Sequence, residues 1–171
     1  MSSEVMCVPR IEKVVVNIGV GEAGERLNKA QKVLQMVTEQ EPVITTAKVT
    51  NRDLGVRHGM PIGCKVTLRG EAASQFLTKA LAIREGKVAV YSFDKEGNMS
   101  FGITDYTDFE GMKYDPEIGI FGMDISVVFM KPGYRVSKRH IMPKKVPAQH
   151  RVTRDEAINF MKTQYNVEVV E

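Results

Sequence analysis

The chain of 171 residues has few of the residues that build disulfide frameworks, metal centres or nucleophilic active sites. Its two cysteines, Cys7 and Cys64, form no Cys-x-x-Cys motif, and we expect both to be reduced and mostly buried. The three histidines, His58, His140 and His150, do not share metal-ligand spacing. No serine or cysteine stands in a nucleophile motif. The sequence therefore indicates no catalytic residues, no metal site and no cofactor.

Long apolar runs are also missing. No stretch approaches the ~20 residues needed to cross a bilayer, and the opening residues MSSEV lack the charged-then-apolar layout of a signal peptide. An apolar fraction of 43% and a charged fraction of 26% are ordinary for one globular domain. We therefore expect a cytoplasmic protein without a membrane partner.

Acidic residues are absent from one long segment, residues 131–151, which carries seven lysines and arginines. The segment also has three prolines and no sustained periodicity, which predicts an extended basic arm. Because like charges repel, such an arm is most simply stabilised against a polyanion. Its candidate RNA contacts are Arg135, Lys138, Arg139, Lys144 and Lys145. Residues 85–117 have the reverse balance, with eight acids and three lysines, which suits a basic partner or simply water.

Alternating apolar and polar residues predict strands at 11–18, 43–50, 62–69 and 123–130, and two short strands, 88–93 and 99–104, joined by a turn. Helical spacing predicts helices at 26–39 and 71–84, and a capping box of Thr153 and Glu156 starts a terminal helix. Half-solvated strands favour an α+β fold, with a mainly antiparallel or mixed sheet covered by helices on one face. We expect a core of residues 1–130, with the arm and terminal helix (131–171) packed on the same domain.

The polar positions of the expected strands would share the uncovered face of this sheet. None of them is acidic: they are Lys13, Asn17, Thr46, Lys48, Lys65, Thr67 and Arg69. Amides, hydroxyls and cations suit phosphate oxygens, ribose hydroxyls and base edges, so the pattern predicts an RNA-binding face. An ordinary solvated face remains the alternative. The loop 51–61 extends the same charge through Arg52, Arg57 and His58, or is a plain mobile loop.

A glycine motif suggests a different class of function. Residues Gly19–Gly24 fit G-x-G-x-x-G between a strand and a helix, which is the setting of a dinucleotide-binding turn. A nucleotide-dependent enzyme is therefore the alternative hypothesis. Against it, the second strand has no acidic residue at its C-terminal end to bind a ribose, and the strands alternate as half-exposed strands do.

Several blocks of the sequence resemble the universal L5 family of large-subunit ribosomal proteins, which bind 5S rRNA. These blocks are PRIEKVVVNIGVGEA (9–23), EPVITTAKVTNR (41–52), RHGMPIGCKVTLRGE (57–71), SFDKEGNMSFGI (92–103) and GMDISVVF (122–129). The resemblance covers nearly the whole chain, and MPIGCKVTLRGE is its most specific part. The KPGYRVSKRH arm and the lack of a long helix before Pro9 are similar to the archaeal and eukaryotic branch. The glycine motif lies within the first block, so the resemblance argues against dinucleotide binding.

The resemblance implies a non-enzymatic constituent of the large subunit, attached to 5S rRNA in the central protuberance through the sheet face. It places Asn17, Gln40 and Thr67 at positions associated with RNA recognition. It further implies that the loop Arg52–His58 approaches the elbow of peptidyl-site tRNA. It also implies an intersubunit bridge to a small-subunit head protein, for which the acidic residues 85–117 are our candidate. Large-subunit rRNA and other central-protuberance proteins are further expected partners, and the sequence is silent on any role outside the ribosome.

Overall fold

A five-stranded sheet organises the protein, which we describe from a computed structural model covering residues 6–170. Its strands are β1 (Arg10–Gly19), β2 (Val43–Thr46), β3 (Pro61–Leu68), β5 (Met99–Ile103) and β6 (Met123–Met130). They lie in the order β2-β3-β1-β6-β5, and every neighbouring pair is antiparallel. The opening residues, which lack the layout of a signal peptide, lie outside the described range. The sheet confirms the antiparallel α+β fold expected from the alternating pattern.

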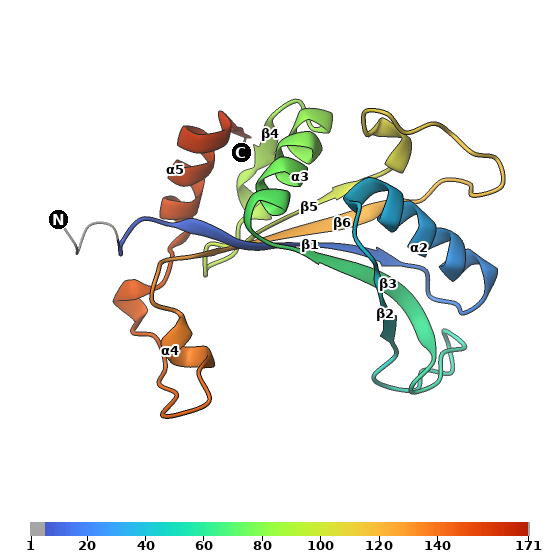
Figure 1. Ribbon diagram of the computed structural model, residues 1–171, viewed down its shortest axis with the longest axis horizontal. Coiled ribbons are helices and arrows are strands. Elements are labelled where there is room, and N and C mark those ends of the chain that lie inside the picture. The colour runs from blue at the N-terminus through green and yellow to red at the C-terminus, as the bar shows by residue number, and fades with distance from the viewer. Residues whose placement is uncertain (1–5, 171) are drawn as a thin grey trace.

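Helices cover one face of this sheet only (Figure 1). They are α2 (Glu25–Thr38), α3 (Gly70–Ile83) and α5 (Arg154–Tyr165). Every second residue of the central strands points towards them, so Val14, Val16 and Ile125 are fully buried. The matching helical stripe includes Leu34 and Leu77, which are also inaccessible to water. Burying such side chains contributes about 1.5–3 kcal/mol each, which fixes the covered face and leaves the opposite face open.

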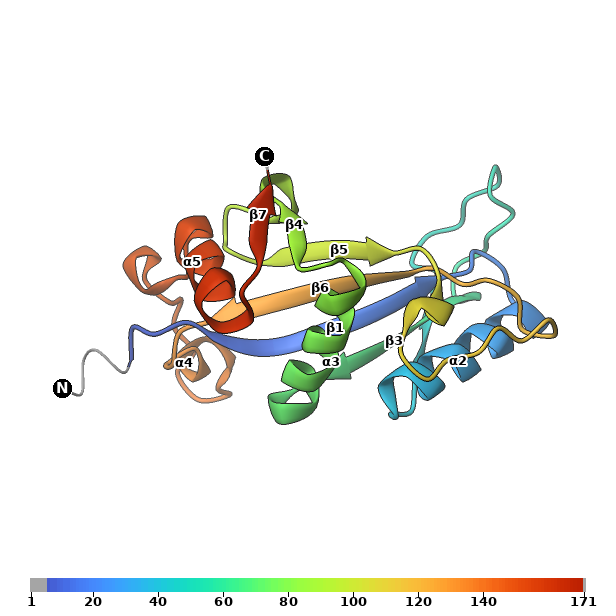
Figure 2. The same cartoon turned by 90° about the horizontal axis from the view of Figure 1, so that it is seen from above.

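The C-terminal part of the chain returns to the covered side of the sheet. Helix α5 begins with the expected capping box, because Thr153 Oγ1 accepts from Glu156 N–H and the Glu156 carboxylate accepts from Thr153 N–H. Met161 is buried in the core. The last strand, β7 (Glu168–Val170), pairs in parallel with β4 (Lys87–Ala89) in a separate two-stranded sheet (Figure 2).

Three expectations about elements need correction. The strand expected at 88–93 ends at Ala89, and a 3-10 turn (Val90–Ser92) follows it. The strand expected at 43–50 ends at Thr46, because the register shifts there and the chain turns away into the following loop. The arm 131–151 is not extended throughout, since it contains the one-turn helix α4 (Arg135–Lys138) and a 3-10 turn (Ala148–His150).

Candidate nucleic-acid interface

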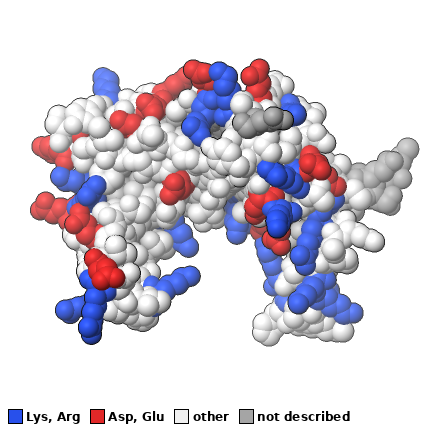
Figure 3. Space-filling model, turned by 180° about the vertical axis from the view of Figure 1, so that it is seen from behind, with Lys and Arg blue, Asp and Glu red and all other residues white. Residues whose placement is uncertain are grey.

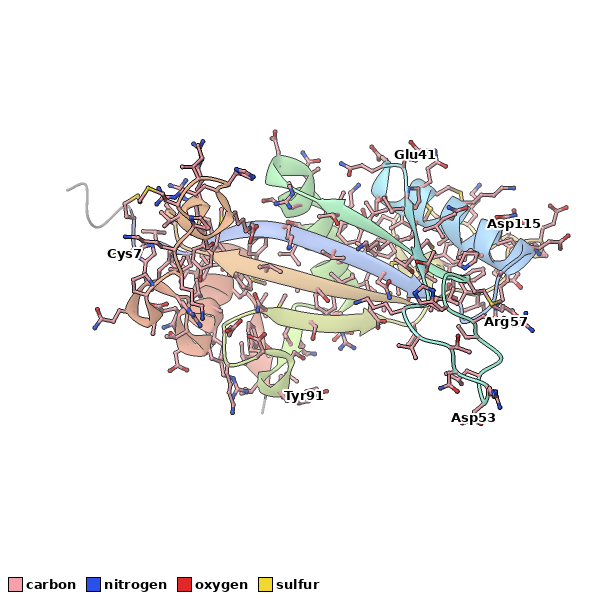
Figure 4. The ribbon with its side chains drawn as sticks, turned by 90° about the horizontal axis from the view of Figure 1, so that it is seen from below. Cys7, Glu41, Asp53, Arg57, Tyr91 and Asp115 are labelled. Carbon is pink, nitrogen blue, oxygen red and sulfur yellow. The ribbon has the colours of Figure 1, made fainter. Side chains whose placement is uncertain are left out.

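The register of the strands fixes which side chains share the open face of the sheet. One row across it runs from Lys65 on β3 to Asn17 on β1 and Asp124 on β6. The next row contains Thr67, Val15, Ser126 and Ser100. Figure 4 views the sheet from this side, where β3, β1, β6 and β5 lie uncovered over most of their length. Lys65, Asn17 and Thr67 therefore stand close together, as the alternation predicted.

The open face also contains acids and small residues that the sequence pattern did not reveal. Asp124 lies beside Asn17, and Ser126 and Ser100 occupy the β6–β5 side. None of the seven positions named from the sequence is acidic, but the sheet adds Asp124 to the same face. The alternation of β6 indicates that Asp124 and Ser126 share one face of their strand. Their position next to β1 could not be predicted, because the order of the strands depends on contacts between distant parts of the chain. Cations are concentrated on the β3–β1 side.

The carboxylate of Glu12 lies near three cations at the edge of this face, Lys13, Arg69 and Lys138. The ladder between β1 and β6 shifts register between Ile11 and Lys13, so Glu12 lies at an irregularity in β1. Its side chain is only 9% exposed, lies 3.7 Å from Arg69 Nη1, and accepts a hydrogen bond from Lys138 Nζ. Burial alone would raise the pKa of Glu12, but the bond from Lys138 and the positive charges of Lys138, Lys13 and Arg69 outweigh it and leave the pKa below its usual value. The sheet face and the arm thus meet at one carboxylate.

The basic arm is held against the core by ion pairs. Lys131 is buried, and its Nζ lies 2.7 Å from Glu156 Oε1. Arg151 Nη1 lies 3.6 Å from Glu96 Oε1. Together with the contact between Lys138 and Glu12, three of the seven cations are paired with acids outside the arm. Within residues 6–170, the other four make no salt bridge: they are Arg135, Arg139, Lys144 and Lys145. The arm is therefore anchored at both ends, and the free cations lie between the anchors.

The loop between β2 and β3 is an ordered projection. Asn51 and Val56 exchange two backbone hydrogen bonds of 2.8 and 2.9 Å, and Ala47 N–H donates to Met60 O. His58 N–H donates to Thr50 Oγ1 at 3.0 Å. Arg52, Arg57 and His58 all remain exposed, as a contact surface requires. These hydrogen bonds give the loop a defined conformation that leaves its three basic side chains exposed.

The loop and the arm flank the open face as two projections on the side opposite the helices (Figure 1). The space-filling view shows the resulting hollow, with lysines and arginines on both projections (Figure 3). A concave face between two basic projections suits a polyanion that is wider than a single extended strand. This shape could not be read from the sequence, because neither projection has a periodic pattern.

Three further candidate residues lie away from the centre of the face. Gln40 is exposed in the turn between α2 and β2. Thr46 is exposed and pairs with Pro61 at the end of β2. Lys48, expected on the sheet face, instead follows the strand and lines a cleft with Val20 and Gly21. In the sequence, Lys48 is closer to the loop 51–61 than to Lys65 and Thr67.

Two amides of the glycine motif already have partners within the fold. The amides of Val20 and Gly21 both donate to Ile62 O, at 3.0 and 2.8 Å. Amides that already have a partner are not available to a pyrophosphate, which is the ligand of such turns. β1 is also flanked by antiparallel strands on both sides, unlike the strand of a doubly wound parallel sheet.

The acids of residues 85–117 fall into two groups along the chain. Glu85, Asp94 and Glu96 precede β5, whereas the others follow it in the connection to β6. Glu85 binds Lys87 at 2.8 Å, and the Asp94 carboxylate accepts from the amides of Glu96 and Asn98. Glu85 and Asp94 thus already have partners within the same segment. The group after β5, in residues 105–117, contains the other five acids, of which Asp105 and Asp115 accept from nearby amides.

The two cysteines lie in different environments. Cys64 is buried on the covered side of β3, and burial raises the pKa of its thiol to about 11. Cys7, expected to be mostly buried, is exposed before β1. Across residues 6–170, no group of three or more histidine, cysteine, aspartate or glutamate side chains is placed to hold a metal ion. No helix in this range is both long and apolar enough to span a membrane.

Comparison with known proteins agrees with the resemblance seen in the sequence. Residues 4–57 match the family ribosomal protein L5, and residues 61–160 match the C-terminal region of the same ribosomal family. A protein of Methanosphaera stadtmanae is 50% identical over 165 residues, covering 96% of this chain and 98% of its own length. A Thermoplasma volcanium protein is 55% identical over 161 residues, covering 94% of this chain and 95% of its own length.

A third relative, from Sulfurisphaera tokodaii, is 52% identical over 163 residues, covering 95% of this chain and 92% of its own length. All three relatives are archaeal and carry the name large ribosomal subunit protein uL5. This family consists of ribosomal proteins and not of enzymes, which removes the nucleotide-dependent alternative. The chain belongs to the ribosomal protein L5 family, as a protein of the large ribosomal subunit.

Proposed function

We propose that this protein attaches 5S rRNA within the central protuberance of the large ribosomal subunit. The observation that carries the proposal is the open sheet face, where Lys65, Asn17 and Thr67 lie side by side between two basic projections. Lys13 and Arg69 extend this surface towards the arm, and Thr46 and Gln40 lie near its other edge. The protein works in the cytoplasm as a structural constituent of the ribosome.

The two projections would make further contacts within the ribosome. The exposed Arg52, Arg57 and His58 of the loop meet the backbone of peptidyl-site tRNA, with Lys48 at the base of the loop. The free arm cations, together with Lys138, contact other large-subunit rRNA. The acids of residues 105–117 face a basic small-subunit head protein in an intersubunit bridge. Neighbouring proteins of the central protuberance complete the set of partners.

The face is tested by replacing Lys65 with glutamine and Thr67 with alanine in one variant. Both side chains are exposed, so folding is expected to be unaffected. Loss of the lysine removes one phosphate contact and lowers the salt dependence of binding by roughly one unit of slope. Loss of the hydroxyl removes a hydrogen bond of about 1 kcal/mol that does not depend on salt. A filter-binding titration with 5S rRNA at several salt concentrations measures both effects.

The matched control replaces Lys79 on α3 with glutamine and Thr163 on α5 with alanine. Both of these residues are exposed on the covered side of the sheet. The control should bind 5S rRNA as the unmodified protein does. If the face variant and the control bind with the same affinity and the same salt dependence, the RNA does not lie on the open face.

A further inference from the structure

The tip of the arm carries two exposed apolar side chains that the proposed contacts do not use. Ile141 is 77% exposed and Met142 is 69% exposed. They follow α4 and line a shallow hollow with Val136, Arg135 and Arg139. Single exposed apolar residues are common on protein surfaces, but two adjacent ones in a strongly basic segment need an explanation.

The backbone holds this pair in a defined conformation. Met142 has a φ of 49°, in the left-handed region that side chains with a Cβ seldom adopt. Arg139 Nε donates to Met142 O at 2.9 Å, and Lys144 N–H donates to Val136 O at 3.1 Å. One guanidinium and one backbone amide thus close the loop that presents Ile141 and Met142. A strained conformation fixed by its neighbours is typical of a contact site.

The charge around the pair points to the partner. Residues 131–151 contain no acid, and four of their cations have no acidic partner within the described residues. An apolar pocket on a protein would need a strongly acidic rim to match this charge. RNA suits both the cations and the apolar pair, because its phosphates match the cations and its unstacked bases offer flat apolar surfaces. The arm also lies on the same side as the open sheet face (Figure 1).

We propose that Ile141 and Met142 form an apolar wedge that packs against unstacked bases of large-subunit rRNA, while the surrounding cations bind the adjacent phosphates. Apolar side chains inserted between bases are a known device of nucleic-acid-binding proteins. This inference rests on the proposed function, since it assumes that the arm lies against ribosomal RNA. It adds a base-directed contact to an arm that otherwise offers only charge.

The wedge is tested by comparing two arm variants of the full chain. One replaces Ile141 and Met142 with serine, and the other replaces Lys144 and Lys145 with glutamine. Binding is measured to deproteinised large-subunit rRNA across a range of salt concentrations. We expect the serine variant to lose about tenfold in affinity at every salt concentration with an unchanged slope, because base packing releases no counterions. The glutamine variant should reduce the slope by about two.

Ile120 provides the matched control, because it is 63% exposed and lies outside the arm. Its replacement by serine should leave rRNA binding unchanged. The wedge is overturned if the Ile141 and Met142 variant binds rRNA with unchanged affinity. If incorporation of this variant into subunits nevertheless falls, the pair contacts a protein partner instead of RNA. A variant of Lys65 and Thr67 that binds 5S rRNA normally would instead count against the proposed function and leave the arm result standing.

Discussion

The buried ion pair between Lys131 and Glu156 gives a sharp test of how the arm is held. The Lys131 side chain is 6% exposed, and its Nζ donates to Glu156 Oε1 at 2.7 Å and to Arg151 O at 3.3 Å. Replacing Glu156 with glutamine leaves this ammonium buried without a counter-charge. Breaking a buried pair in this way costs about 3–5 kcal/mol. Because Glu156 is itself 39% exposed, we expect the lower end of this range.

In a protein of this size the melting temperature falls by about 2–4 °C for each kcal/mol lost. The expected loss of about 3 kcal/mol should therefore be plain in both urea unfolding and calorimetry. Asp155, an exposed acid in the first turn of the same helix, provides the control, since its replacement by asparagine costs only about 0.3–1 kcal/mol of helix-dipole stabilisation. Replacing Lys131 with methionine and Glu156 with leucine together should restore most of the stability, because well-packed apolar residues can substitute for a buried pair.

The same pair predicts how stability depends on pH. Burial alone would raise the pKa of Glu156, but hydrogen bonds from Lys131 and Thr153 and the charge of Lys131 hold the pKa below its usual 4.5. A lowered pKa stabilises the fold above the unfolded-state pKa, and this stability is lost as the pH falls through the folded-state pKa. The glutamine variant should therefore show a flatter loss of stability below about pH 4.5. The explanation is refuted if the variant costs no more than the Asp155 control and has the same pH profile.

Two remaining predictions concern the flanks of the open face. Replacing Glu12 with glutamine should lower the free energy of unfolding by about 1 kcal/mol, because two partly exposed ion pairs are lost; urea unfolding measures this, and a change no larger than that of Glu22→Gln, which breaks only an exposed pair with Arg26, would contradict it. Replacing Arg52 and Arg57 with alanine should lower crosslinking of the subunit to peptidyl-site tRNA and leave 5S rRNA binding intact, whereas equal losses in both assays would assign the loop to 5S rRNA.

Much of the sheet could be predicted because its strands are half buried. β1, β3 and β6 alternate apolar and polar residues, and each lies within one residue of its expected bounds. Helices α2, α3 and α5 could be predicted equally well, since each has an apolar stripe and α5 has a capping box. These features are local, so the sequence displays them directly.

The rest of the candidate site depends on contacts between distant residues. Asp124 joins Asn17 only through the pairing of β1 with β6, and Glu12 meets Lys138 across 126 positions of the chain. β7 has only three residues, so it has no periodicity long enough to detect, and its pairing with β4 joins segments about 80 positions apart in the chain. The arm was expected to repel itself, but Glu12, Glu96 and Glu156 neutralise part of its charge. Such pairings are set by the fold and not by local pattern.

The position of the RNA relative to the sheet can be measured with a cleavage reagent tethered to a single cysteine. Cys7 is exposed and must first be replaced with serine, whereas Cys64 is buried with a pKa of about 11 and is expected to react poorly. Ser126 places the reagent at the centre of the open face, and Gln75 places it on α3 on the covered side. If the open face binds 5S rRNA, the reagent at residue 126 should cleave it and the reagent at residue 75 should not. Cleavage from residue 75 alone would contradict the central claim.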